Sequence, residues 1–310
     1  MSADTLNIVS FASNNPDRQS ELREGVETVC AGRKFELFFC ETEEEALQHI
    51  RDAEILLSHG FSPALFHAAD KLRWIQRTDA GVEHTLFPEL VASDVILTNA
   101  RGFHAVPMAE WTLGILLYIS QAFQHIAEWK THREWRPVKQ SITAARFFLR
   151  GKRALVVGHG EIGRPVAELL SSVGIHCEAV AASTRDSFIP VHAVQELSHI
   201  ISGFDIVVIT IPHTRETNKL FDRDLFSKMK PGAILVNLAR GKIIDQSALI
   251  EALASGPLGF AALDVFEEES LPEDSPLFNT PNLIMTPHIS GNFPDYTKRI
   301  HELFLDNLQR

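Results

Sequence analysis

The sequence predicts an α/β protein built from two units, each a parallel β-sheet covered by helices. Strand-like and helix-like segments alternate along nearly the whole of the 310 residues, as they do in layered α/β folds. The apolar run Ala154–Val157 ends in the glycine-rich sequence Gly158–Gly163, and a helical pattern follows at Pro165–Leu170. A long apolar-rich segment near 107–132 separates two such alternations, so we expect two parallel sheets.

The first alternation covers about the first third of the chain. Its expected strands are Leu6–Phe11, Lys34–Cys40, Ala53–His59, Arg73–Thr78 and Val95–Ala100, and its expected helices are Thr42–Asp52 and Pro63–Ala69. Thr42 and Glu45 have the spacing of a capping box, in which each side chain bonds a backbone N–H of the other residue. Glu43 and Glu44 suit the positive end of a helix dipole.

The second alternation follows a helix expected over Pro107–His132, where Pro107 suits the first turn. Its expected strands are Arg153–Val157, His176–Ala181, Asp205–Ile211, Ala233–Leu238 and Gly259–Asp264. A last amphipathic helix is expected near Asp295–Leu308, with Ile300, Leu303, Phe304 and Leu308 on one face. The natural place for this helix is on the first unit. The predicted domains are therefore residues 1–101 with 290–310, and residues 102–289.

The chain carries 29 Lys and Arg against 40 Asp and Glu, a formal net charge of −11. This balance argues against a nucleic acid or an anionic membrane as a partner, because both call for a basic face. The local basic cluster Lys130, Arg133, Arg136 and Lys139 is typical of a solvated helix end. The three cysteines are isolated and have no metal-binding spacing, as in a reducing compartment. With no export signal and no apolar run near ~18 residues, we expect a cytoplasmic protein without a metal.

The glycine-rich sequence is the strongest single indication of a ligand. A strand that leads into a glycine turn and a helix N-terminus presents unpaired N–H groups and the positive end of the helix dipole to an anion. Gly158 permits the tight turn, Gly160 lets the backbone approach a pyrophosphate, and Gly163 lets the helix pack closely on the strand. Glycine turns also serve merely as turns, but the flanking strand and helix favour a dinucleotide site.

Three later segments place polar residues at or just after predicted strand ends, where doubly wound sheets bind ligands. They are Asn237–Gly241, Ala261–Glu269 and Thr286–Gly291. A guanidinium can bind the carboxylate of a keto acid and polarise its carbonyl group. A histidine can donate a proton near neutral pH, and a carboxylate behind it fixes the ring and stabilises its protonated form. Beside a nicotinamide, such a set would suffice for hydride transfer to a keto acid.

Taken in order, these motifs resemble the D-isomer-specific 2-hydroxyacid dehydrogenases. The resemblance covers nearly the whole chain and rests on Gly158–Gly163, Pro212–Thr217, Asn237–Gly241, Ala262–Glu269, and Ser275–Leu277 through Thr286–His288. It implies two Rossmann-like domains, which are doubly wound parallel sheets, with a cleft between them. The first would be a flavodoxin-like, substrate-binding domain and the second the dinucleotide-binding domain. It also implies a homodimer that acts on a small 2-ketoacid or 2-hydroxyacid.

Carried over position by position, the resemblance assigns a role to each motif residue. Arg240 would bind the carboxylate and keto oxygen of the substrate, His288 would be the acid/base, and Glu269 its partner, with Glu268 as the second choice. Asp264 would hold the nicotinamide carboxamide, although such a residue can also simply cap a strand-end turn. Besides the three glycines, Arg240 and His288, the cofactor contacts would come from Glu161, Ile162, Ile211, Pro212, Thr217, Leu238 and Ala239. In the first domain, the backbone amides of Gly81 and Val82 would hold the substrate carboxylate.

The strand His176–Ala181 ends without the acidic residue that binds ribose hydroxyls and selects NAD. Ala181 stands where NAD-selective members of the family carry Asp. After Ala181, the chain continues with Ser183 and Thr184, whose hydroxyl groups can donate hydrogen bonds to a 2′-phosphate. Arg185 then offers a guanidinium group that can bind the same phosphate through two N–H groups. These residues predict a preference for NADP, with NAD as a possible second cofactor. If Arg185 instead points to solvent, the enzyme uses either cofactor.

The substrate side is less determined by the sequence. Phe61 and Phe293 suggest room for an apolar side chain, although a hydrophobic core explains either residue as well. The expected activity is therefore reduction of glyoxylate or hydroxypyruvate, or else of a bulkier 2-ketoacid. Glutamate at 269 argues against formate oxidation, because the formate-oxidising relatives place glutamine there. The alternative from another class is a dinucleotide-sensing protein that keeps the dehydrogenase fold.

Overall fold

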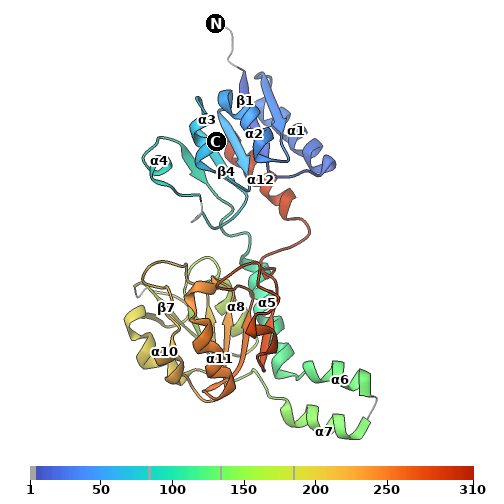
Figure 1. The fold of residues 1–310 in the computed structure, drawn as a ribbon, viewed down its shortest axis with the longest axis vertical. Coiled ribbons are helices and arrows are strands. Elements are labelled where there is room, and N and C mark those ends of the chain that lie inside the picture. The colour runs from blue at the N-terminus through green and yellow to red at the C-terminus, as the bar shows by residue number, and fades with distance from the viewer. Residues whose placement is uncertain (1–4, 83–84, 133–134, 184–185) are drawn as a thin grey trace. The chain divides into compact units, whose positions relative to one another are not determined.

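The computed structural model describes residues 5–82, 85–132, 135–183 and 186–310. The chain divides into two compact units, Met1–Phe103 with Phe293–Arg310, and His104–Asn292 (Figure 1). Each unit is a parallel sheet with helices on both faces, which confirms the predicted α/β class. Within the described ranges, no helix combines the length and the apolar character that crossing a membrane requires.

Unit 1 contains a five-stranded parallel sheet in the order β2-β1-β3-β4-β5, that of flavodoxin-type doubly wound sheets. Its strands are β1 (Leu6–Phe11), β2 (Phe35–Phe39), β3 (Ile55–Ser58), β4 (Trp74–Arg77) and β5 (Ile96–Thr98). Helices α1 (Pro16–Cys30) and α12 (Tyr296–Gln309) cover one face, where Leu22 and Phe304 pack against Ile8. The other face is covered by α2 (Glu43–His49) and α3 (Pro63–Ala68). The short elements η1 (Ile50–Asp52) and α4 (Pro88–Val91) complete the unit.

Helix α1 was not expected from the sequence. The Asn15 side chain caps it by accepting hydrogen bonds from the backbone N–H groups of Asp17 and Arg18, and Pro16 starts its first turn. Only Leu22 and Val26 are buried along its 15 residues. A helix with so narrow an apolar stripe leaves little periodic signal in the sequence.

Unit 2 contains a seven-stranded parallel sheet in the order β12-β11-β10-β9-β6-β7-β8. Its strands are β6 (Arg153–Val157), β7 (His176–Ala181), β8 (Val191–Ala193), β9 (Ile206–Ile209), β10 (Ala233–Asn237), β11 (Leu258–Leu263) and β12 (Leu283–Met285). The chain runs outward from β6 to β7 and β8 and then crosses to β9 on the other side of β6. The switch point of this sheet therefore lies between β6 and β9, where doubly wound folds bind ligands.

The helices of unit 2 cover both faces of its sheet (Figure 1). Helices α5 (Ala105–Ser120) and α8 (Gly163–Ser172) pack on one face. Helices α9 (Leu197–Ile200), α10 (Arg223–Ser227) and α11 (Gln246–Ala254) pack on the other. Helices α6 (Gln124–His132) and α7 (Trp135–Ala145) form a hairpin that extends away from the sheet. The short turns are η2 (Val194–Glu196), η3 (Ile201–Gly203), η4 (Gly241–Ile243) and η5 (Pro276–Asn279).

The single helix expected over Pro107–His132 is wrong, because the structure has two helices there. Helix α5 begins two residues before Pro107 and ends at Ser120, and α6 begins at Gln124. Between them the buried Ala122 has a left-handed backbone with φ of 56°. The N–H of Phe123 bonds the carbonyl of Tyr118, which closes α5 in the manner of a Schellman motif. No glycine marks this break, so the sequence pattern runs through it.

A buried histidine on α12 makes unit 1 sensitive to acid. The His301 side chain is 4% exposed, and its ring nitrogens have no hydrogen-bond partner within the described ranges. Burial lowers the pKa of His301 from 6.5 to about 4, with Glu21 and Arg18 of α1 as the nearby charges. Between these values the unfolded chain binds a proton that the folded chain does not, so stability falls as the pH drops.

We expect the substitution His301→Leu to remove this acid sensitivity. The shift corresponds to about 3 kcal/mol of unfolding free energy lost between pH 6.5 and 4. Urea unfolding at pH 7 and pH 4.5 should give a smaller difference for His301→Leu than for the wild type. His67→Leu, which changes an exposed histidine of the same unit, is the control. Equal pH dependence in the wild type and His301→Leu would contradict this account.

Candidate active site

The glycine-rich turn joins β6 to α8 and has the geometry of an anion cradle. Gly158 has φ of 112°, and a Cβ there would lie 2.7 Å from Thr210 Oγ1. A Cβ on Gly163 would lie 1.8 Å from the Gly158 carbonyl oxygen, so the helix start packs tightly on the turn. At Gly160, by contrast, a Cβ would meet no atom within 4 Å. The backbone of Gly160 is therefore open to a close approach, which fits a bound pyrophosphate.

The other residues of this turn differ in exposure. Glu161 is exposed and Ile162 is half-buried. His159 is buried, with its Nε2 2.8 Å from Ser187 Oγ, and it links the glycine turn to the segment that follows β7. Ser183 in that segment is exposed. Thr184 and Arg185, the other two residues expected at a 2′-phosphate, lie outside the described residues.

The turn after β9 lies against the glycine turn. The Ile211 N atom is 2.9 Å from the position of a Cβ on Gly158. Thr217 Oγ1 donates a hydrogen bond to the Pro212 carbonyl at 2.8 Å and accepts one from the Thr214 N–H at 2.7 Å. The structure thus brings Ile211, Pro212 and Thr217 together in one turn at the switch point of the sheet.

The Arg240 turn follows β10 and is shaped by Asn237, a fully buried residue to which the sequence assigned no role. Asn237 Oδ1 accepts from the Ala239 N–H at 3.1 Å, and Nδ2 donates to the Arg240 carbonyl at 3.0 Å. Arg240 Nη1 donates to the Ala239 carbonyl at 2.8 Å. A Cβ on Gly241 would lie 1.8 Å from the Phe266 carbonyl carbon. The Arg240 turn, which includes the buried Leu238 and Ala239, is therefore pinned against the loop after β11.

Asp264 follows β11 and anchors the loop that carries His288. The residue is fully buried, and its Oδ1 accepts hydrogen bonds from the Thr286 hydroxyl and, at 2.8 Å, from the Ile289 N–H. Its Oδ2 accepts from the Ser290 N–H at 2.9 Å. The Asp264 carbonyl also accepts from the His288 N–H at 2.9 Å. Both carboxylate oxygens thus fix the backbone around His288.

We expect Asp264→Asn to lower both stability and turnover. The amide replaces one acceptor oxygen with a donor, which leaves an N–H of the 286–290 loop unmatched at a cost of about 1–3 kcal/mol. The Tm and the rate of the 2-ketoacid reduction expected from the sequence, measured on the same preparation, should both decline. Asp224→Asn, which changes an exposed carboxylate of the same unit, should leave both unchanged. A wild-type Tm in Asp264→Asn would show that these bonds do not hold the loop.

His288 and Glu269 form the closest acid–base pair of the candidate site. His288 Nδ1 lies 2.7 Å from Glu269 Oε2, and Glu269 Oε1 accepts from the Phe266 N–H at 3.1 Å. The contact is made by Glu269, so the alternative partner Glu268 is not supported by the geometry. The His288 side chain is 52% exposed. Its Nε2 has no hydrogen-bond partner among the residues that the structure describes, so this nitrogen can meet a substrate.

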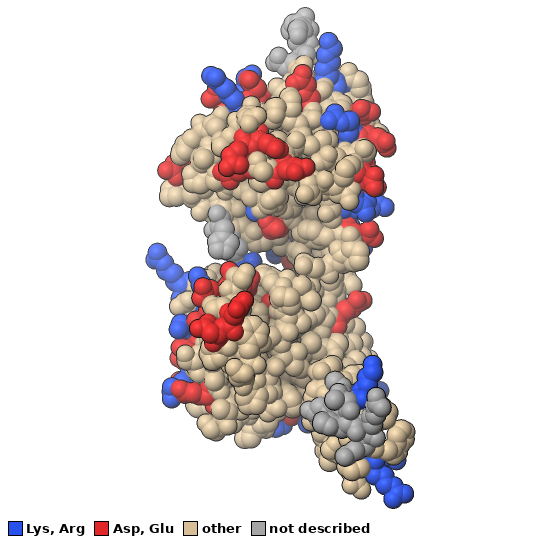
Figure 2. All heavy atoms as spheres, turned by 45° about the vertical axis from the view of Figure 1, so that its right-hand side comes forward, with Lys and Arg blue, Asp and Glu red and all other residues tan. Residues whose placement is uncertain are grey.

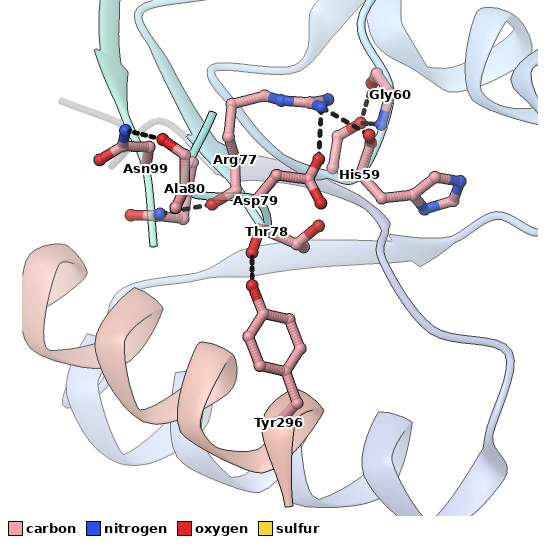
Figure 3. A network of polar contacts seen from close by, with 10 residues as sticks. His59, Gly60, Arg77, Thr78, Asp79, Ala80, Asn99 and Tyr296 are labelled. Carbon is pink, nitrogen blue, oxygen red and sulfur yellow. Dashed lines mark hydrogen bonds and ion pairs between the residues drawn. The ribbon is translucent and has the colours of Figure 1, made fainter. Parts of the chain in front are cut away.

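In unit 1, the loop 78–82 contains Gly81 and Val82, the two residues expected to bind a carboxylate, and Figure 3 shows the polar contacts of the residues Thr78, Asp79 and Ala80 that precede them. The Tyr296 hydroxyl donates a hydrogen bond to the Thr78 carbonyl, and Asn99 Nδ2 donates to the Ala80 carbonyl at 2.6 Å. The N–H groups of Gly81 and Val82 have no acceptor in the described part of the chain. Two N–H groups side by side on a fixed loop can bind an oxyanion.

Other residues of unit 1 have structural roles. Phe61 is 6% exposed and packs against Phe66 and Phe87, so the hydrophobic-core explanation holds for it. Arg77, which also belongs to the network in Figure 3, was missed by the sequence analysis. A charged residue at the carboxyl end of a predicted strand is the signal that could have identified it. Across the described residues, no group of three or more His, Cys, Asp or Glu side chains is arranged to hold a metal.

Comparisons with known proteins agree with this arrangement. Residues 113–290 match the family model described as D-isomer specific 2-hydroxyacid dehydrogenase, NAD binding domain. The glyoxylate reductase of Thermofilum pendens is 32% identical over 277 residues, covering 86% of this chain and 80% of that protein. The chloroplastic/mitochondrial formate dehydrogenase of Arabidopsis thaliana is 29% identical over 280 residues, covering 87% of this chain and 71% of that protein. A crystal structure of a D-isomer specific 2-hydroxyacid dehydrogenase family protein from Aeromonas salmonicida superimposes with a TM-score of 0.83 at 32% identity, covering 98% of this chain and 94% of that one.

Proposed function

The chain belongs to the D-isomer specific 2-hydroxyacid dehydrogenase family of NAD(P)-dependent oxidoreductases, and on that premise we propose that it is a 2-ketoacid reductase that prefers NADPH. The observation that carries the proposal is the 2.7 Å contact between His288 and Glu269, within the unit that also holds the open glycine turn. A histidine backed by a carboxylate and with its second nitrogen accessible is equipped for proton transfer to an alkoxide.

In the proposed reaction, hydride transfer, proton transfer and substrate binding are carried out by different groups. The bound nicotinamide cofactor supplies the hydride for the keto carbon. His288 gives its Nε2 proton to the oxygen of that carbon, and Glu269 holds the imidazole ring through Nδ1. Arg240 binds the substrate carboxylate and polarises the carbonyl group. The N–H groups of Gly81 and Val82 contribute further hydrogen bonds to the carboxylate.

The glycine turn, with Glu161 and Ile162, is proposed to hold the cofactor pyrophosphate. Contacts to the rest of the cofactor come from Ile211, Pro212, Thr217, Leu238, Ala239 and Arg240, and from His288. Asp264 lies beside the nicotinamide in this proposal, and it also orders the His288 loop through its own carboxylate.

The proposed preference for NADPH rests on the end of β7. Ala181 leaves no carboxylate there to repel a 2′-phosphate, and Ser183, Thr184 and Arg185 supply donors for one. The measurement is kcat/KM for NADPH and for NADH, each determined at the same saturating concentration of ketoacid. A higher value with NADH would remove the NADPH preference while leaving the reductase activity intact.

Among substrates, glyoxylate and hydroxypyruvate come first. The similarity to the glyoxylate reductase of Thermofilum pendens supports placing glyoxylate first. The packing of Phe61 in the core removes one of the two residues that favoured a bulkier 2-ketoacid. Oxidation of NADPH and NADH against glyoxylate, hydroxypyruvate, pyruvate and phenylpyruvate tests the proposal directly. Tight dinucleotide binding without turnover of any of the four would instead favour the sensing protein.

We also propose that the protein is a cytoplasmic homodimer. Trp135 on α7 is 68% exposed, and Phe123 and Phe148 at the two ends of the α6–α7 hairpin are 47% and 79% exposed. On the face drawn in Figure 2, lysines and arginines are scattered among acidic groups, which does not suggest a nucleic-acid surface. Light scattering should give the mass of two chains for the wild type. Trp135→Glu should give the mass of one, and a wild-type monomer would refute the dimer.

A further inference from the structure

Arg77 is a buried arginine at the carboxyl end of β4, directly before the loop 78–82. Its side chain is 7% exposed. Nη2 donates to the His59 carbonyl at 2.6 Å and to Asp79 Oδ2 at 2.7 Å (Figure 3). These two bonds join the loop that follows β3 to the loop that follows β4. Arg77 thereby fixes the position of Asp79, two residues before Gly81.

The stability of unit 1 does not explain an arginine at this position. Arg77 Nε and Nη1 are buried and have no acceptor within the described ranges. A buried donor without an acceptor destabilises the folded state, and a buried ion pair is often no more stable than apolar side chains of similar volume. Burial lowers the pKa of Arg77, an effect that Asp79 opposes. The role of Arg77 therefore lies in the two groups that its hydrogen bonds hold in place, the His59 carbonyl and the Asp79 carboxylate.

The two hydrogen bonds of Arg77 add to others that hold the backbone of residues 78–80, directly before Gly81. The Tyr296 hydroxyl bonds the Thr78 carbonyl, and burial with the nearby Asp79 raises the pKa of Tyr296 to about 12, so it stays a donor. The Asp79 carbonyl accepts from the Ala100 N–H at 3.0 Å. The Asp79 side chain is 49% exposed and is held through Arg77. The backbone and the side chain of Asp79 are thus both fixed, two residues before Gly81.

We propose that Arg77 is a positioning residue that directs the Gly81 and Val82 amides toward the substrate carboxylate through its bonds to Asp79 and to the His59 carbonyl. This inference rests on the proposed reductase function. In this proposal Arg77 acts only through His59 and Asp79 and contacts neither the reacting atoms nor the dinucleotide. Its loss should therefore weaken ketoacid binding while leaving cofactor binding in unit 2 unchanged.

The test compares Arg77→Met with the wild type and with Arg51→Met. Arg51 is an exposed arginine of the same unit, paired with Asp70 at 3.0 Å, and serves as the matched control. Arg77→Met should raise KM for the ketoacid about tenfold, because small misplacements of a binding group have large effects. Its dinucleotide Kd, measured by fluorescence, should equal that of the wild type. Its Tm should be equal or higher, which a merely structural arginine would not allow.

A second variant keeps the proposal testable if Arg77→Met fails to fold. Asp79→Ala removes only a half-exposed carboxylate, and we expect it to raise KM at least about threefold with the fold intact. A ketoacid KM within twofold of the wild type in folded Arg77→Met, or in Asp79→Ala where Arg77→Met does not fold, would overturn the positioning role. Absence of turnover in the wild type would remove the reductase proposal itself, so the two failures are distinguishable.

Discussion

Replacement of His288 by asparagine is expected to lower kcat for ketoacid reduction by about three orders of magnitude, the range found for a lost general acid. Asparagine is the appropriate replacement because His288 has φ of 52°, a left-handed conformation that asparagine tolerates better than alanine. The variant keeps the backbone N–H that bonds the Asp264 carbonyl. The loop should therefore stay in place while the proton donor is lost.

The measurement is the steady-state kcat for ketoacid reduction at saturating cofactor, together with the dinucleotide Kd and the Tm. The Tm should remain near the wild-type value, and any change in the dinucleotide Kd measures the proposed contact of His288 with the cofactor. His199→Asn, which changes an exposed histidine of the same unit, should have no effect. A kcat for His288→Asn within tenfold of the wild type would exclude His288 as the proton donor.

The central strands of both sheets were predicted well because most of their residues are buried on both faces. Such strands appear in the sequence as short, nearly continuous apolar runs. The bounds of β1, β6 and β7 were predicted to the residue. The edge strands β8 and β12 have three residues each and neither was predicted, whereas the equally short edge strand β5 was. The break after α5 was also missed, because Ala122 is a good helix former that adopts a left-handed backbone only in the context of the core.

In the candidate site, too, residues in local sequence motifs were predicted, whereas residues that act through contacts between distant segments were not. Arg240, Glu269 and His288 follow strand ends, and motifs at fixed spacings identify them. Asn237 and Arg77 act through hydrogen bonds from side chain to backbone, which sequence spacing does not reveal. Asp264 was placed at the site by its motif, but its three bonds to the 286–290 loop depend on the parallel pairing of β11 with β12. Residues that shape the candidate site therefore needed the structure, whereas the residues proposed to carry its chemistry were identified from the motifs.

Replacement of Arg240 is expected to have the largest effect on kcat/KM, because one guanidinium is proposed to serve two functions. It binds the substrate carboxylate in the ground state and stabilises the charge on the keto oxygen in the transition state. Loss of the first function raises KM, and loss of the second lowers kcat. We expect Arg240→Ala to reduce kcat/KM by about four orders of magnitude, the product of about tenfold in KM and about a thousandfold in kcat.

Arg240→Lys separates the two functions, because it keeps the charge and loses the planar fork of donors. If bidentate geometry matters, the lysine variant should recover ketoacid binding but little of kcat. Arg240 extends from a turn fixed by Asn237 and by the packing of Gly241, so both variants should keep the wild-type Tm. The dinucleotide Kd of each variant measures the proposed contact of Arg240 with the cofactor separately from ketoacid binding. Arg223→Ala, which removes an exposed arginine paired with Glu251, controls for loss of positive charge in the same unit. If Arg240→Lys keeps the wild-type kcat, a point charge is sufficient at this position and the proposed polarisation through a guanidinium fork is wrong.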